Sequence, residues 1–598
     1  MLHLRSEWDK QMPTALNDFR AIRFANQRKG HPGPYLVPLF SKMQRLKYAT
    51  LAILWVLSIS YFWAWWLQPE HVISTPRFVI LSLALGWATF LECYFLTVLL
   101  RSRRPANRLG ELFGSRVAMI VTKTPSEPFD IVRVTLEAML AQDYPHDTWL
   151  ADEDPSPETI AWCAERGVQI STRKDRQDYH RSEWPRRTRC KEGNLAFFYD
   201  HYGYEQYDFV IQMDADHVPQ ESYLREMLKP FADKEVGYVS GPSICASNRA
   251  DSWAARTRLY RESMFHGVLQ AGYSNGMAPM CIGSHYAVRT AALREVGGLG
   301  PELAEDHSTS MIMNAGGWRG VHSLDAIAIG AGPANITDMI TQEFQWSRSL
   351  VTLLLRYTPT YFKRLRPALK FQFIFSQLWY PISALFMLVM YAAPIYAIVF
   401  TAPFAAVTYP AFIGHLLPAG LLFLIIAYVI KRDGFYRPNS AAFMSWEKAL
   451  FPCLQWPWVF WGCAMAIFDS ISGRFVDFRI TPKGDSQKIN LSWRVILPYF
   501  VLAIGALVPV FLAPNPQTIP GFFVLSIMNA ALFGTIFLII VWDYLRTTML
   551  TDSINPIVAG KLAMAAVVLI AMMSSAIWMR GRDSIFALVS SPQVLGHF

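Results

Sequence analysis

The stretch Phe-Val-Ile-Gln-Met-Asp-Ala-Asp at 209–216 places two acidic residues directly after a short apolar run. A run of this length predicts a buried strand. Asp214 and Asp216 would then stand at the carboxyl end of that strand. In open parallel sheets this end is where ligands bind, so the stretch predicts both a sheet and a site at its edge.

Strand and helix patterns alternate on the N-terminal side of this stretch. We expect strands at 116–121, 148–151 and 168–170, and helices at 130–141 and 157–166. The first helix should place Val134, Ala138 and Met139 on one apolar side. Strands that alternate with helices imply an α/β domain with a parallel sheet.

The rest of the chain is too apolar for an ordinary soluble enzyme, with 52% hydrophobic and 17% charged residues in 598. A bilayer span needs about 20 apolar residues. Runs of that kind occur at 48–67, 78–100, 373–400, 410–430, 495–513, 520–541 and 562–579. The polar stretch between the second and third runs is long enough for one domain with its own core.

Positive charges gather at the ends of these runs, and the net charge is +9. Arg101, Arg103 and Arg104 follow the second run, and Lys431 and Arg432 follow the fourth. This distribution follows the positive-inside rule and indicates a cytosolic N-terminus and α/β domain. It does not form the basic stripe of a nucleic-acid-binding protein, so no nucleic acid partner is expected. The first 46 residues are polar, so we expect no cleavable signal peptide.

Residues 449–470 are apolar but contain Pro452, Pro457 and three tryptophans, at 456, 458 and 461. If they spanned the bilayer, the basic loop after them would lie outside, against the positive-inside rule. We therefore expect an interfacial helix, about seven spans, a cytosolic loop and a non-cytosolic C-terminus, and we expect 349–372 to be interfacial as well. The expected divisions are a cytosolic segment at 1–46, two spans in 47–100, the α/β domain at 101–348, interfacial helices at 349–372, two spans in 373–431, an interfacial helix and loop at 432–492, three spans in 493–580 and a tail at 581–598.

Several short motifs occur in a fixed order along the polar regions. They are Thr124-Pro125-Ser126-Glu127-Pro128, Asp152, Lys191-Glu192-Gly193-Asn194, Asp214-x-Asp216, Gly283-Ser284, Glu305-Asp306, Gln342-x-x-Gln345-Trp346 and Phe478-x-Ile480-Thr481-x-Lys483-Gly484. Each is weak alone, since an acidic pair is often a helix cap or a turn. In this order, over about residues 116–490, the chain resembles the family 2 glycosyltransferases of the cellulose synthase superfamily, which are bacterial, membrane-embedded and processive.

The resemblance implies a GT-A-type cytosolic glycosyltransferase domain inserted in an α-helical transmembrane domain, in the bacterial inner membrane. It also implies roles for single residues. The donor nucleotide would be bound by Thr124, Glu127, Asp152, Lys191 and Asp214, and Mg²⁺ or Mn²⁺ would be held by Asp214 and Asp216. The catalytic base would be Asp306, beside Glu305. The acceptor would be bound by Gln342, Gln345 and Trp346, and a gating loop would be formed by Phe478, Thr481 and Lys483.

The chemistry agrees with these roles. A hard divalent cation takes oxygen ligands and can neutralise a departing diphosphate. An inverting transfer needs a base, and the charge of Glu305 would raise the pKa of Asp306. The alternative is that Glu305 and Asp306 cap a helix that starts near Ser308.

Two positions depart from the family pattern. Gln345 stands where the family has Arg, and Gln cannot make a charged bidentate contact with phosphate. Arg348 lies nearby and is a candidate substitute. Pro125 stands where the family has Tyr, so stacking on the base would differ.

The expected function is polymerisation of sugar units, with UDP-glucose as the expected donor, into a β-glycan that crosses the inner membrane. The alternatives are transfer of a single sugar to a lipid acceptor and a non-catalytic subunit or transporter. The expected partners are a nucleotide-sugar donor, the growing polysaccharide and the lipid bilayer. Periplasmic or membrane accessory subunits stay open.

Overall fold

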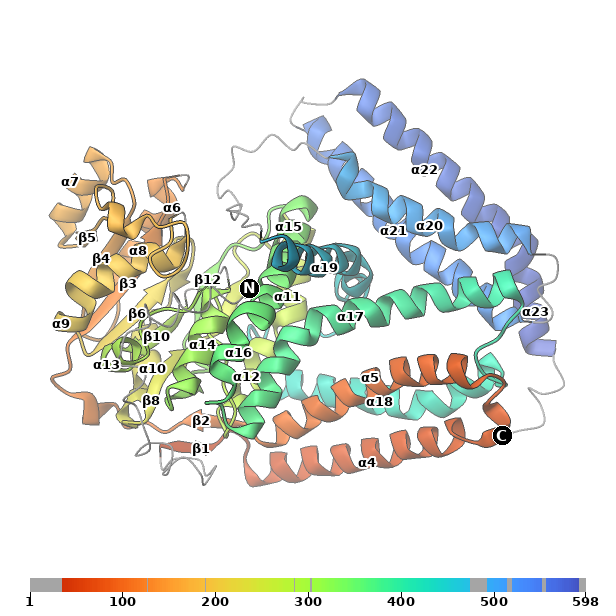
Figure 1. The fold of residues 1–598 in the computed structure, drawn as a ribbon, viewed down its shortest axis with the longest axis horizontal. Coiled ribbons are helices and arrows are strands. Elements are labelled where there is room, and N and C mark those ends of the chain that lie inside the picture. The colour runs from red at the N-terminus through yellow and green to blue at the C-terminus, as the bar shows by residue number, and fades with distance from the viewer. Residues whose placement is uncertain are drawn as a thin grey trace.

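The computed structural model describes residues 35–125, 127–188, 190–283, 285–301, 304–473, 492–513, 519–550 and 555–590. An α/β domain and a set of long helices lie at opposite sides of the molecule, with shorter helices between them (Figure 1). The expected α/β domain inserted among long apolar helices is confirmed. Ser284 and the predicted gating residues Phe478, Thr481 and Lys483 lie outside the described residues.

The α/β domain is built on a sheet of seven strands in the order β11-β8-β10-β6-β3-β4-β5. The strands are β3 Val117–Lys123, β4 Asp147–Asp152, β5 Gln169–Ser171, β6 Phe209–Met213, β8 Val236–Ser240, β10 Tyr286–Arg289 and β11 Arg319–His322. The strands β3 to β6 are parallel as expected, but β10 runs antiparallel to β6 and to β8. The sheet is therefore mixed, and the residues before β10 lie at the same edge as the carboxyl ends of β3, β4 and β6.

Two smaller sheets accompany the large one. In the first, β12 Ala328–Gly330 pairs with β7 Val218–Pro219 and with β9 Ser243–Cys245. In the second, β1 Leu36–Pro38 pairs with β2 Arg103–Pro105 and so joins the two ends of the first helical hairpin.

The helices that cover the sheet have amphipathic sequences. Of the two predicted helices, α6 spans Phe129–Leu140 and α7 spans Pro157–Arg166. The predicted apolar side of α6 was partly wrong, because Val134 is exposed while Val132, Leu136 and Met139 are buried. These three positions follow the i, i+4, i+7 spacing of one helix face. The remaining helices of this domain are α8 Lys191–Phe198, α9 Tyr204–Gln206, α10 Tyr223–Leu228, α11 Trp253–Glu262, α12 Gln270–Tyr273, α13 Thr290–Glu295 and α14 Glu305–Ala315.

Among the described residues, eight helices are long and apolar enough to cross a membrane. They are α4 Lys42–Trp66, α5 Thr75–Leu100, α17 Pro367–Phe400, α18 Tyr409–Arg432, α19 Trp446–Ser472, α20 Trp493–Leu512, α21 Pro520–Leu550 and α22 Pro556–Ala576, which continues into α23 Arg582–Ser590. Seven of them cover the apolar runs seen in the sequence. The eighth is α19, which we expected to lie in the interface.

The surroundings of α19 differ from those of the other long helices. It packs against α15 Ile336–Thr352, and half of its most apolar stretch is buried inside the protein, against 44% for α20 and α21 and 17% for α5. In Figure 1 it is strongly foreshortened, whereas α4, α5, α17 and α18 run across the picture. These features suit an interfacial helix, and its place relative to a bilayer stays a prediction.

The segment expected to be interfacial at 349–372 contains the end of α15 and α16 Thr358–Phe362. The following helix, α17, begins at Pro367, which is earlier than the apolar run that starts at 373. Its first turn therefore combines the buried Leu369 with the charged Lys370.

Candidate active site at the carboxyl edge of the sheet

Three neighbouring strands end at one edge of the large sheet. Asp152 is the last residue of β4 and is fully buried, and its carboxylate lies 3.0 Å from the amino group of Lys123, the last residue of β3. Asp152 also accepts a hydrogen bond from the backbone N–H of Asp154 at 3.0 Å. The structure thus places Asp152 at the predicted strand end, held by a lysine that sequence reasoning missed.

The first residues of α8 connect this edge to β6. The amino group of Lys191 forms an ion pair with Asp214, which follows β6 directly. Asn194 donates a hydrogen bond to the carbonyl oxygen of Ala151 at 3.0 Å and so fixes α8 against β4. Two of the predicted nucleotide-binding residues, Lys191 and Asp214, are therefore in contact.

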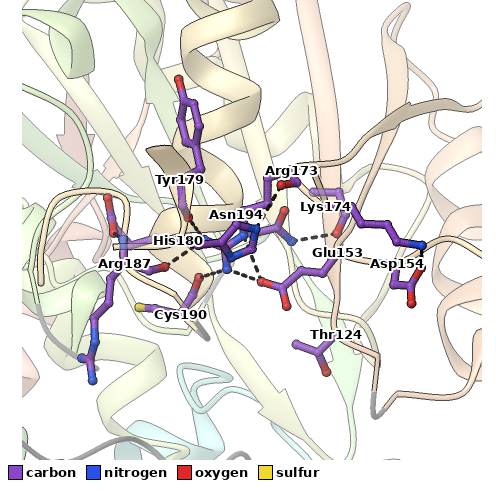
Figure 2. Close-up of polar contacts among 12 residues, drawn as sticks. Thr124, Glu153, Asp154, Arg173, Lys174, Tyr179, His180, Arg187, Cys190 and Asn194 are labelled. Atoms are coloured by element: carbon purple, nitrogen blue, oxygen red, sulfur yellow. Dashed lines mark hydrogen bonds and ion pairs between the residues drawn. The ribbon is translucent and has the colours of Figure 1, made fainter. Parts of the chain in front are cut away.

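A buried arginine organises the basic segment that precedes α8. Arg173 is fully buried, forms an ion pair with Glu153 and donates hydrogen bonds of 2.8 Å to the carbonyl oxygens of Tyr179 and Arg187 (Figure 2). A Cβ at Gly193 would lie 2.1 Å from the carbonyl oxygen of Arg187, so the helix can approach only with glycine there. The glycine of the Lys191-Glu192-Gly193-Asn194 motif thus has a packing reason.

The loop after β3 carries two other predicted donor residues. Glu127 is buried, and its carboxylate accepts a hydrogen bond of 2.9 Å from the backbone N–H of Thr124. Lys123, the residue before Thr124, is paired with Asp152 across β3 and β4. The loop therefore lies beside Asp152, and contact of its residues with a nucleotide stays a prediction.

Helix α14 begins at Glu305, earlier than the predicted start near Ser308, so Glu305 and Asp306 lie in its first turn. The carboxylate of Asp306 accepts hydrogen bonds from the backbone N–H groups of Gly283, at 2.8 Å, and His307, at 2.7 Å. Gly283 has a φ of 57°, and a Cβ there would lie 3.0 Å from a carboxylate oxygen of Asp214. Gly283 therefore lies next to both acidic residues: its backbone N–H donates to Asp306, and the space that a Cβ would fill borders Asp214.

The two adjacent carboxyl groups of α14 differ in their proton affinity. Burial raises the pKa of Glu305 to about 8, and the charge of Asp306 adds to that rise. Burial also raises the pKa of Asp306 to about 6, against the opposing effect of its two backbone hydrogen bonds. We expected the charge of Glu305 to raise the pKa of Asp306, but burial is the main cause of that rise. Both carboxyl groups thus have a raised pKa, and that of Glu305 is raised further than that of Asp306.

Three side chains at this edge could hold a divalent cation. Each of Asp214, His217 and His285 offers one ligand atom, and these three atoms lie within 4.8 Å of one another. The Nε2 atoms of both histidines are buried and have no hydrogen-bond partner among the described residues. Burial lowers the pKa of His285 to about 3, which keeps the imidazole in the neutral form that binds metals. The donor set therefore fits a divalent cation.

This set differs from the predicted pair of Asp214 and Asp216. The carboxylate of Asp216 lies 3.3 Å from Nδ1 of His217, and a ligand role for Asp216 stays a prediction. His217 could have been suspected because it follows the acidic pair directly. His285 likewise follows the Gly283-Ser284 motif, but its place at this edge depends on the antiparallel direction of β10, which the sequence did not predict.

The predicted acceptor residues lie on α15, away from the strand ends. Gln345 is buried, while 36% of the Trp346 surface is exposed. The guanidinium of Arg258, on α11, lies 4.4 Å from the centre of the Trp346 ring and 3.4 Å from the side-chain oxygen of Gln342. Sequence reasoning missed Arg258, because nothing in the local pattern of α11 points to α15.

Arg348, the candidate substitute for the missing family arginine, is engaged elsewhere. Its Nε lies 2.8 Å from a carboxylate oxygen of Asp469 on α19. A Cβ at Gly462 would lie 2.2 Å from the hydroxyl of Ser347, so α15 and α19 are in close contact at this point. Arg348 therefore joins these two helices, which weakens its candidacy for a phosphate contact.

Comparison with known proteins agrees with this arrangement. Residues 209–430 match the family model described as glycosyl transferase family group 2. The chain is 24% identical over 402 residues to the cellulose synthase catalytic subunit of Pseudomonas fluorescens, covering 63% of this chain and 49% of that protein. It is 25% identical to the corresponding subunit of Komagataeibacter sucrofermentans, covering 46% of this chain and 36% of that protein.

The chain thus spans less than half of the length of these two relatives. Among solved structures, the mannosyltransferase PcManGT from Pyrobaculum calidifontis, in complex with GDP-Man and Mn²⁺, aligns with a TM-score of 0.40 and 15% identity, covering 71% of this chain and 99% of that one. The family match and the relatives together support a family 2 glycosyltransferase of the cellulose synthase type.

Proposed function

We propose that this protein is an inverting, processive glycosyltransferase that takes sugar units from a nucleotide sugar, with UDP-glucose as the expected donor. It would link them into a β-glycan and pass the product across the inner membrane. The observation that carries this proposal is the placement of Asp306 and Asp214 on either side of Gly283. The base and the diphosphate-binding group must both lie near the anomeric carbon, because the acceptor hydroxyl attacks that carbon while the nucleoside diphosphate leaves it.

The donor would lie along the carboxyl edge of the sheet. Asp152 with its partner Lys123 stands at the end nearest the Thr124 loop, where we place the nucleotide. Lys191 stands beside Asp214, where its positive charge would face the diphosphate. A cation held by Asp214, His217 and His285 would neutralise charge on the leaving group.

Asp306 would act as the general base. The acceptor hydroxyl oxygen forms a bond to the anomeric carbon, the bond from that carbon to the phosphate oxygen breaks, and the hydroxyl proton passes to Asp306. Attack from the side opposite the leaving group inverts the anomeric configuration. The two backbone hydrogen bonds hold the carboxylate in position, and a pKa of about 6 leaves it ionised at neutral pH.

Processive synthesis requires that the product stays bound between transfers. Trp346 is partly exposed on α15, so it offers a flat apolar face on which a sugar ring can stack. Beyond α15, Trp379 on α17 contacts the rings of Trp87 and Phe375, at centroid distances of 6.2 and 6.1 Å. We place the product path near these helices, although these rings themselves pack against one another between α5 and α17.

The test uses the purified full-length chain in lipid nanodiscs with a divalent cation. UDP-glucose, UDP-N-acetylglucosamine and GDP-mannose are supplied in parallel, and released nucleoside diphosphate and product size are measured together. We expect one donor to give high-molecular-weight product. Asp130→Asn, which changes an exposed carboxylate on α6, serves as the control variant. A product only one sugar larger than a lipid acceptor would contradict processivity, and absence of turnover with every nucleotide sugar would contradict the proposal as a whole.

A further inference from the structure

A buried cluster of charges lies between α11 and α15, outside the strand-end site. The side chain of Arg258 is 4% exposed, and its NH1 lies 2.8 Å from Glu262 on the same helix and 2.7 Å from Glu343 on α15. A buried ion pair gains little net stability, because desolvation of the charges offsets their attraction. Stability alone is therefore a weak reason for this cluster.

The geometry of the cluster points to the acceptor helix. Two carboxylates fix the plane of the Arg258 guanidinium, which lies 4.4 Å from the centre of the Trp346 ring. Its NH2 also lies 3.4 Å from the side-chain oxygen of Gln342. One planar group thus contacts two of the three residues predicted to bind the acceptor.

A guanidinium that lies over an indole ring restricts how the ring can rotate. Arg258 covers one side of the Trp346 ring, and 36% of the Trp346 surface stays exposed. Arginine can do this because its guanidinium is flat, whereas the ammonium group of lysine is a compact point charge. The arginine also places a fixed positive charge next to α15, where Gln345 is neutral.

We propose that Arg258 is a positioning residue, which holds Trp346 and Gln342 in the orientation that retains the end of the growing glycan between transfers. This inference rests on the proposed function. Arg258 acts through Trp346, and the donor and metal groups at the strand ends do not depend on it.

The test compares Arg258→Lys with wild type, with cellohexaose as the acceptor probe. Lysine keeps the charge near Glu343 but loses the flat contact with the ring. We expect the Kd for cellohexaose to rise about 2- to 30-fold, the range of a cation–π contact, with shorter polymer as the product. Release of nucleoside diphosphate without acceptor should change less than twofold.

Arg261→Lys is the matched control. Arg261 lies on the same helix, and its guanidinium lies over Phe451, 5.7 Å from the ring centre. Arg258 approaches the same ring at 6.0 Å, so this control tests the shared contact while the contact of Arg258 with Trp346 stays intact. This variant should keep the wild-type Kd and polymer length. An equal effect of both substitutions, or an equal loss of thermal stability that accounts for the weaker binding, would overturn the proposal.

A double-mutant cycle separates positioning from a general structural effect. If Arg258 acts through Trp346, Arg258→Lys should change the Kd little once Trp346→Ala is present. An effect of the same size in both backgrounds would contradict the proposed route. If wild type binds cellohexaose but adds only one sugar, the proposed processive function fails while the role of Arg258 is still decided by the cycle.

Discussion

At the scale of single residues, the site depends on neighbouring groups that differ in protonation. Glu305 and Asp306 are consecutive in the chain, but Glu305 is more deeply buried and receives a hydrogen bond of 3.2 Å from the hydroxyl of Tyr286. Asp306 instead accepts two backbone N–H groups, which favour its ionised form. The two carboxyl groups therefore differ in their surroundings, and the proposed base is the one held by two backbone N–H groups.

This difference predicts the pH dependence of transfer. Asp306 must be deprotonated to accept a proton, so activity should fall as the pH decreases through about 6. Glu305→Gln should retain much of the activity at pH 7, because the amide resembles the protonated acid. The pH profile of initial rates, with the wild type and Glu305→Gln side by side, checks this. A rate that stays constant down to pH 4 would contradict the assignment.

The donor set at the metal site predicts which cation works best. Mg²⁺ prefers oxygen ligands, whereas His217 and His285 offer nitrogen. After removal of metals with a chelator, Mn²⁺ should restore activity at a lower concentration than Mg²⁺ does. His285→Ala should lose this preference, and His146→Ala, away from the site, should keep it. Lower half-saturation for Mg²⁺ in the wild type would count against the histidines as ligands.

At the scale of secondary-structure elements, the sequence predicted the strands and helices that are determined by residues close together in the chain. The strand before Asp214 and the helix α7 follow from local apolar patterns and are found at the expected places. The direction of β10 and the contact of Arg258 with α15 arise from packing between distant segments. His285 and Arg258 could therefore not be predicted from sequence.

The role of α15 predicts a separation of two activities. Trp346→Ala should reduce polymer length while leaving some hydrolysis of the nucleotide sugar, because Lys191, Asp214 and the histidines lie on other elements. Released nucleoside diphosphate and high-molecular-weight product are measured on the same sample. Wild-type polymer length in this variant would leave the acceptor role of Trp346 without support.

At the scale of the whole molecule, the eight long helices include one whose course decides the topology. If α19 lies in the interface, both of its ends face the cytosol, and if it spans, they face opposite sides. Met444 and Ser472 are exposed positions near its two ends. In a background where the exposed Cys93 is replaced by Ala, cysteines at 444 and 472 should both resist an impermeant reagent applied from outside intact cells. Labelling of only one of them would show that α19 spans.

The most direct test of the central claim is the transfer activity of Asp306→Asn. The variant keeps the size of the side chain and one of the two oxygens that accept backbone hydrogen bonds, but it cannot take a proton. With purified protein in nanodiscs and the active donor, the rate of polymer formation should fall by about 10² to 10⁴, while the affinity for the nucleoside diphosphate stays near that of wild type. More than half of the wild-type rate in Asp306→Asn would contradict the account.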